Sequence, residues 1–170
     1  MELEQAIRTR RTHKAYAPEA LDRETLDELF ELARWAPNHK LTNPWRFRVL
    51  GPRALQRLKA AVEDPVAAAK LDRAPTLVAV TTTQSGDPVM DEEDMLATAA
   101  AAYVVLLAAH GRGLAGYWRT PGVLRTAGGR AALGIPDAER VLGLLHLGHA
   151  RQHPRVPERA PVESVASYLD

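Results

Sequence analysis

The stretch that decides the fold runs from Asp91 to His110 and reads DEEDMLATAAAAYVVLLAAH. Its four acidic residues come first, where negative charge complements the positive end of a helix dipole. The rest is apolar on nearly every side, and a helix of that kind must be buried. We therefore expect one long helix, starting near Asp91 and ending near His110, that packs both centrally and against another subunit.

Four shorter stretches around this helix have the patterns of strands. Thr76 to Thr83, TLVAVTTT, is β-branched and apolar, which is typical of a buried strand. From Trp45 to Leu50 apolar residues alternate with arginines, the period of a strand with one buried face. Leu114 to Arg119 and Val141 to Gly148 predict two more strands, separated by a glycine-rich turn and a short helix.

Three further helices are expected nearer the N-terminus. The first covers Leu3 to Arg10, and the third covers Arg53 to Val62. The second starts after Asp22, a good N-cap, and stops before Pro37, because proline disfavours helical geometry in the residue before it. Helices and strands that do not alternate in regular βαβ units indicate an α+β fold.

Length and composition limit the classes of protein. The chain has 170 residues, 46% of them hydrophobic, a formal net charge of +1 and no cysteine. We expect one compact domain over residues 1–170, without disulfides or thiolate metal sites. Balanced charge argues against a nucleic-acid partner. The longest apolar run, Met95 to Ala109, is shorter than the ~20 residues of a membrane span.

Two terminal features add to this expectation. The N-terminal MELEQAIRTRR has no apolar core of a secretory signal, so we predict a cytoplasmic protein without a membrane partner. The segment after His149 contains Pro154, Pro157 and Pro161, which favour an extended path. Such a tail is suited to covering a partner subunit.

Two apparent motifs can be set aside. GRGLAG, from Gly111 to Gly116, matches the dinucleotide fingerprint, but it follows a helix and precedes a strand, the reverse of the required order. A glycine helix stop explains it better. His146, His149 and His153 have a spacing that suggests a metal site, yet on a strand the first two face opposite sides. We predict no metal site.

Three segments remain that could carry chemistry. Arg10, Arg11 and Lys14 surround Thr12 and could hold a phosphate or an electron-rich ring edge, although charge alone favours a solvated basic face. The loop of residues 36–45 could be an ordinary connection with a surface histidine. The segment of residues 116–122 could be a strand that finishes in a proline turn.

Together these segments resemble the nitroreductase superfamily of FMN-dependent oxidoreductases, in particular its small, YdjA-like branch. RRTHKAY (residues 10–16) is similar to the family's N-terminal motif. APNHK (36–40), followed by PWRF (44–47), resembles the signature of the small branch, and GYWRT (116–120) resembles a later segment. LLHLG (144–148) is similar to the last core strand, so the resemblance spans nearly the whole chain.

The resemblance implies a fold and a cofactor. The fold would be an α+β, three-layer α/β/α sandwich with a mixed, mainly antiparallel central sheet, in an intimate homodimer with two FMN sites at the interface. Arg10, Arg11 and Thr12 would hold the phosphate and ribityl end or the pyrimidine edge. Lys14 would face flavin N1 and O2, where negative charge grows on reduction.

The other implied cofactor contacts are spread over two segments. His39 would contact FMN across the interface, and Trp118, Arg119 and Thr120 would line the other end of the site. Trp35 stands where members of the small branch often carry arginine, so stacking could replace a charged contact. The flavin would carry the redox chemistry, so no side chain is assigned as acid, base or nucleophile.

The function implied is an FMN-dependent oxidoreductase. It would take a hydride from NADH or NADPH and pass electrons to a small acceptor such as a nitroaromatic or a quinone. Two alternatives stay open: a specialised enzyme of the superfamily, for flavin cleavage or dehalogenation, and a non-catalytic flavin-binding or interaction module.

Overall fold

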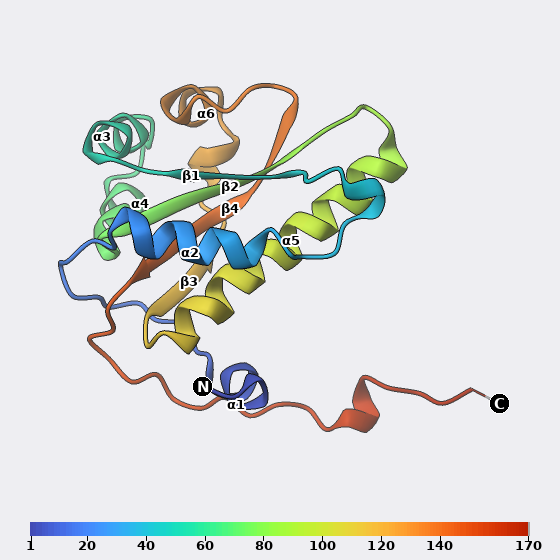
Figure 1. Ribbon diagram of the computed structural model, residues 1–170. Helices are drawn as coiled ribbons and strands as arrows, with labels where there is room; N and C mark the ends of the chain where they lie inside the picture. The colour runs from blue at the N-terminus through green and yellow to red at the C-terminus, as the bar shows by residue number, and fades with distance from the viewer. Residues whose placement is uncertain (170) are drawn as a thin grey trace.

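The computed structural model describes residues 1–169, and a four-stranded sheet lies at its centre (Figure 1). The strand order is β1-β2-β4-β3, and every neighbouring pair is antiparallel. The strands are β1 (Trp45–Val49), β2 (Thr76–Thr83), β3 (Ala115–Arg119) and β4 (Glu139–Gly148). The four predicted strands are therefore confirmed, and β2 has the predicted bounds.

Helices cover both faces of this sheet and complete three layers (Figure 1). One face carries α2 (Arg23–Ala33) and α5 (Pro88–Gly111), and α1 (Leu3–Thr9) packs against α5. The other face carries α3 (Pro52–Ala60), α4 (Pro65–Ala69) and α6 (Ala127–Leu133). The α+β sandwich is confirmed. Within residues 1–169 the parallel component of the expected mixed sheet is one isolated bridge, between Thr12 and Gly116.

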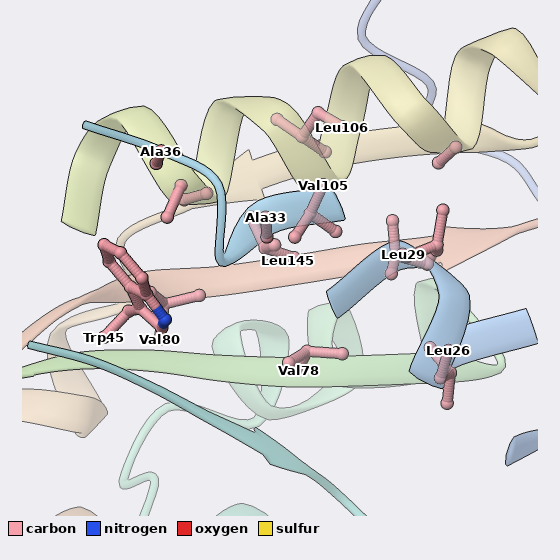
Figure 2. Packing of buried hydrophobic residues seen from close by; sticks show 14 of the residues in the cluster. Leu26, Leu29, Ala33, Ala36, Trp45, Val78, Val80, Val105, Leu106 and Leu145 are labelled. Carbon is pink, nitrogen blue, oxygen red and sulfur yellow. The ribbon is translucent and has the colours of Figure 1, made fainter. Parts of the chain in front are cut away.

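Strand β2 shows how sequence alternation builds two cores. Val78 and Val80 point toward α2 and α5, where Leu29 and Val105 complete the packing (Figure 2). Leu77 and Ala79, which alternate with these valines, belong to a separate cluster on the opposite face. All are nearly or completely buried. Each large side chain removed from water in this way stabilises the fold by about 1.5–3 kcal/mol.

The starts of the helices depend on local capping residues, which the sequence predicted for α2 but misplaced for α5. Asp22 caps α2, because its carboxylate accepts a hydrogen bond from the Thr25 amide at 2.8 Å. The long helix begins at Pro88, three residues earlier than expected, because Asp87 caps it through the Val89 and Met90 amides. The short helix α4 was not predicted.

Helix α5 is central, as predicted, but only part of its surface is covered. One side, including Ala101, Ala102 and Val105, is completely buried against α2 and the sheet. On the other side Leu96 is 60% exposed and Tyr103 40%. The helix is long and apolar enough to cross a membrane by length and composition alone, but it forms the middle of this packed core.

Strand β4 is longer than its neighbour β3 and continues beyond it. Its last five residues pair with β3, whereas Glu139 to Gly143 pair only with β2 or with nothing. Where β3 ends, the Trp118 side chain packs directly on Gly143. Only glycine fits there, since a Cβ at this position would stand 2.3 Å from the indole nitrogen of Trp118. The segment after β4 is extended, as predicted, and leaves the body of the molecule past α1 (Figure 1).

Candidate functional site

The first part of the candidate site lies where α1 ends beside α5. Arg10 is the C-cap of α1, and its guanidinium carbon stands 5.9 Å from the ring centre of Tyr103 on α5. Arg11 is half-buried, and its Nη1 donates to the carbonyl oxygens of Arg8 at 2.7 Å and Arg10 at 2.8 Å. These contacts fix both arginine side chains at the C-terminal end of α1.

The chain then runs along the free edge of β3. Thr12 pairs with Gly116, and the His13 amide donates to the Gly116 carbonyl at 3.2 Å. Gly116 also lies tightly against α5, because a Cβ there would stand 2.7 Å from a methyl group of Leu106. The side chains of Thr12 and Lys14 remain exposed. The N-terminal motif is therefore presented along an open sheet edge.

Three histidines that are not among the predicted cofactor contacts also lie in this region. Burial lowers the pKa of His13, and the nearby His110, His153 and Arg10 lower it further, while the Gln152 backbone acts in the opposite direction. Burial also lowers the pKa of His110, with Arg10 and Arg11 adding to the effect. His110 is held by a 2.8 Å hydrogen bond with the Thr9 hydroxyl. We use the name cationic cluster for the two cations Arg10 and Arg11 together with the neighbouring His13, His110 and His153.

The cationic cluster contains buried nitrogen atoms without hydrogen-bond partners. Within the part of the chain that the structure describes, the buried Nε of Arg11 and Nδ1 of His13 have no hydrogen-bond partner. No carboxylate of residues 1–169 lies within ion-pair distance of the cluster. Buried polar groups of this kind are costly unless a partner satisfies them. The chemistry of the cluster therefore fits an anion, and a phosphate monoester in particular.

The second part of the candidate site is the end of β3, where Trp118 and Arg119 point to opposite faces of the sheet. Trp118 packs against the core beside α5, and its indole N–H donates to the Leu142 carbonyl at 3.3 Å. Arg119 donates to the Lys70 carbonyl at 3.1 Å on the other face. Thr120 is exposed just beyond the strand. One flat ligand could not touch all three side chains as they stand.

His146 lies on the same face as Arg119 and is completely buried. Its ring is tilted against that of Tyr117 at 5.8 Å, and neither ring nitrogen has a partner among the described residues. Burial, together with Arg119 and Arg73, lowers its pKa to about 4. It is therefore a neutral core histidine at neutral pH. In the described residues no group of three His, Cys, Asp or Glu could hold a metal ion.

The third part of the candidate site is the loop between α2 and β1. Lys40, Leu41 and Asn43 all have left-handed backbone angles, with φ between 47° and 53°. Such strain in residues other than glycine is uncommon and occurs preferentially at functional sites. The loop is tied to α5 by the Thr42 hydroxyl, which donates to the buried Asp94 at 2.5 Å. The loop therefore has a specific conformation that is anchored to α5.

Two predicted residues in this loop lie apart from the cationic cluster. His39 stands 3.8 Å from the carboxylate of Glu93. Glu93 and Tyr103, the residue beside Arg10, are about 15 Å apart along α5 at 1.5 Å per residue. Trp35, 76% exposed, lies over an apolar groove formed with α1 and α5. Within one chain the structure does not bring His39 to the cluster.

The comparisons with known proteins agree with this architecture. The model described as "Nitroreductase family" matches residues 7–149. The chain is 26% identical over 175 residues to "Putative NAD(P)H nitroreductase YfhC" of Bacillus subtilis, with 94% of this chain and 90% of that protein covered. It is also 26% identical over 152 residues to the protein of the same kind named YdjA in Escherichia coli, with 82% and 83% covered.

Solved structures give the same result. A nitroreductase-like family protein from Bacillus cereus has a TM-score of 0.91 at 22% identity and covers 100% of this chain and 97% of its own. A protein from Desulfovibrio desulfuricans, described as a "putative nitroreductase in complex with fmn", has a TM-score of 0.82 at 25% identity, with 100% and 98% covered. The chain belongs to the nitroreductase family, in the YdjA-like branch.

Proposed function

We propose that the protein is an FMN-dependent oxidoreductase that uses NADH or NADPH to reduce a small acceptor, such as a nitroaromatic or a quinone. Support comes from the relatives named NAD(P)H nitroreductases and from the similar structure that contains FMN. The observation that carries the proposal is the cationic cluster, where the buried Nε of Arg11 and Nδ1 of His13 have no hydrogen-bond partner within residues 1–169.

The cluster fits the phosphate of FMN. Arg10 and Arg11 provide planar donors that match phosphate oxygens. The exposed hydroxyl of Thr12 stands beside them, where it can donate to the phosphate or to the ribityl chain. An anion that accepts from Arg11 and His13 would remove the cost of their unsatisfied groups.

The remaining predicted residues would serve the ring system. FMN supplies the redox chemistry, by accepting a hydride and passing electrons on. Lys14 is exposed and forms no ion pair within residues 1–169, so its ammonium group could approach O2, where charge develops. Thr120 can donate from the end of β3, while Trp118 and Arg119 hold that end in place through the Leu142 and Lys70 carbonyls.

A homodimer completes this site in the proposal. The exposed apolar side chains of α5 and the groove under Trp35 leave a surface suited to a second copy. His39 and Trp35, which lie away from the cluster of their own chain, would then serve the site of the partner. The extended tail, with Val162, Val165 and Tyr168 exposed, would cover that partner. We further propose that residues 1–170 act as one domain in the cytoplasm.

The visible absorption spectrum of the purified protein tests the proposal, followed by mass analysis of any released chromophore. We expect FMN at about one per chain, and oxidation of NADH or NADPH in the presence of a nitroaromatic or a quinone. The variant Arg10→Ala should lose flavin, whereas Arg53→Ala, an exposed arginine on α3, should retain it.

The outcomes separate the alternatives. Flavin that binds but is not reduced by either nicotinamide would leave a non-catalytic flavin-binding module. Turnover that consumes the flavin itself, or that removes halide from a substrate, would identify a specialised enzyme. A colourless protein that refuses added FMN would refute the proposal.

A further inference from the structure

A second cationic region lies at the other end of β4, in a cavity of about 570 Å³. It is formed where β4 extends beyond β3, and α5, α6 and the turn after Pro121 close its sides. Its arginines are Arg125, Arg130 and Arg140. The volume lies in the range of small-molecule sites and exceeds what an inorganic ion needs.

The charges of this cavity do not cancel. Glu139 is buried, and Arg48 neutralises it through two hydrogen bonds, at 2.7 Å and 2.9 Å, while the Thr81 hydroxyl donates to the same carboxylate. Asp137 approaches Arg130 only to 4.0 Å and is fully exposed. Three arginines against one exposed carboxylate therefore leave an excess of positive charge.

The arginines differ in how they are held. Arg130 is fixed by the carbonyl oxygens of Pro136, at 2.5 Å, and Glu139, at 3.1 Å, so its guanidinium is preorganised. Arg125 and Arg140 have no hydrogen-bond or ion-pair partner within residues 1–169. Two uncommitted guanidinium groups beside a fixed one can surround an anion with bidentate donors.

Apolar groups form part of the cavity wall. Met95 of α5 and Val141 and Leu142 of β4 line it together with the polar residues. An apolar surface next to several cations suits a ligand with a flat ring and a phosphate, rather than a free ion. Leu142 also joins the cavity to the proposed flavin site, because its carbonyl accepts from the Trp118 indole, two residues before Thr120.

We propose that this cavity binds the phosphate monoester of a nucleotide, and that the 2′-phosphate of NADPH is the group it selects. The second half of this inference rests on the proposed function. NADPH and NADH differ by this one phosphate monoester, so an excess of positive charge here discriminates between them. The donor preference of the enzyme is therefore set by Arg125, Arg130 and Arg140, away from the cationic cluster.

Titration calorimetry with two probes tests the site directly, on protein saturated with FMN so that the cationic cluster is filled. Adenosine 2′,5′-bisphosphate should bind about tenfold or more tightly than adenosine 5′-monophosphate at low salt. The double variant Arg125→Ala/Arg140→Ala should lose most of this difference. Both side chains are exposed, so the fold should persist. Arg53→Ala removes the same type of charge elsewhere and should change nothing.

The preference of the enzyme for NADPH over NADH provides a second test. The ratio of kcat/KM for NADPH to that for NADH should exceed one and fall toward one in the double variant, while the FMN content stays at the wild-type level. Equal affinity for the two probes, or the same loss with Arg53→Ala, would overturn the inference. A protein that does not bind FMN would refute the proposed function instead, and the two probes on the flavin-free protein would still decide the cavity.

Discussion

The cationic cluster and the cavity lie at opposite ends of β4, and they differ in whether their charged groups have a partner of opposite charge within the protein. The cluster contains Arg10, Arg11 and three histidines with no carboxylate of residues 1–169 within ion-pair distance, and two of its buried nitrogen atoms have no hydrogen-bond partner there. The cavity also has an excess of positive charge, but its buried carboxylate, Glu139, is paired within the protein with Arg48 and Thr81. A buried pair that the protein completes itself is costly to break, whereas cations without a carboxylate partner are suited to binding an anion.

The largest expected effect is on stability at the cavity. Glu139→Gln leaves Arg48 without its buried partner, so we expect a loss of about 3 kcal/mol in the free energy of unfolding. Urea unfolding measures it, and Glu63→Gln, an exposed residue, is the control. A loss of unfolding free energy below about 1 kcal/mol would contradict the stabilising role of the Glu139–Arg48 pair.

The pH dependence of this effect has a definite sign. Burial would raise the pKa of Glu139, but hydrogen bonds from Arg48 and Thr81 lower it below the ordinary 4.5. The stabilisation is therefore present above the unfolded pKa and is lost as the pH falls through the folded one. The difference between wild type and Glu139→Gln should shrink as the pH falls below the ordinary pKa of 4.5.

The next effect is on cofactor binding at the cluster. Arg10→Ala should raise the dissociation constant of FMN by about 10–100-fold, because charge-assisted hydrogen bonds to the phosphate are lost. Equilibrium dialysis with fluorescence detection measures it. Arg125→Ala, at the cavity, should change FMN affinity by less than about twofold. Similar losses in both variants would remove the distinction between the regions.

A smaller effect concerns the histidines. The pKa values of His13 and His110 are lowered in the free protein, by burial first and then by neighbouring cations. A phosphate dianion favours their protonated forms, so FMN binding takes up protons and should tighten as pH falls from 8 toward 6.5, by up to about tenfold per unit. Below about pH 6 the phosphate itself protonates and the gain ends.

The variant His110→Gln tests whether the histidines cause this dependence of FMN affinity on pH. Glutamine can keep a hydrogen bond with Thr9 but cannot gain the charge. The FMN dissociation constant of the variant should depend less on pH than that of the wild type. An unchanged slope, or affinity that weakens toward pH 6.5, would show that these histidines do not face the phosphate.

The smallest effect is expected for Asp137 in the cavity. Its side chain is fully exposed, so Asp137→Asn should tighten adenosine 2′,5′-bisphosphate by less than about threefold and leave FMN binding unchanged. The gain should disappear at high salt, because solvent-exposed charges are screened. Calorimetry at two ionic strengths measures it. A weaker affinity would mean that Asp137 orients Arg130 instead.

The sequence determined the elements whose signals are local. TLVAVTTT predicted β2 over its full length, and Asp22 predicted the start of α2, because burial and capping depend on neighbouring residues. The start of α5 was placed too late, because the acidic run outweighed the Asp87–Pro88 cap. The motifs around Arg10, His39 and Trp118 also identified the family, which the comparisons confirm.

Only the tertiary structure determined which charged and titratable side chains lie close together. His13 and His110 are distant in sequence and come together only because α1 ends beside the last turn of α5. In the same way, Arg48 finds Glu139 across three strands, and Arg125, Arg130 and Arg140 surround one cavity because β4 outruns β3. Periodicity and capping act over a few residues, whereas electrostatic interactions act through space, and this is why the sequence predicted the helices and strands but not the partners of their charges.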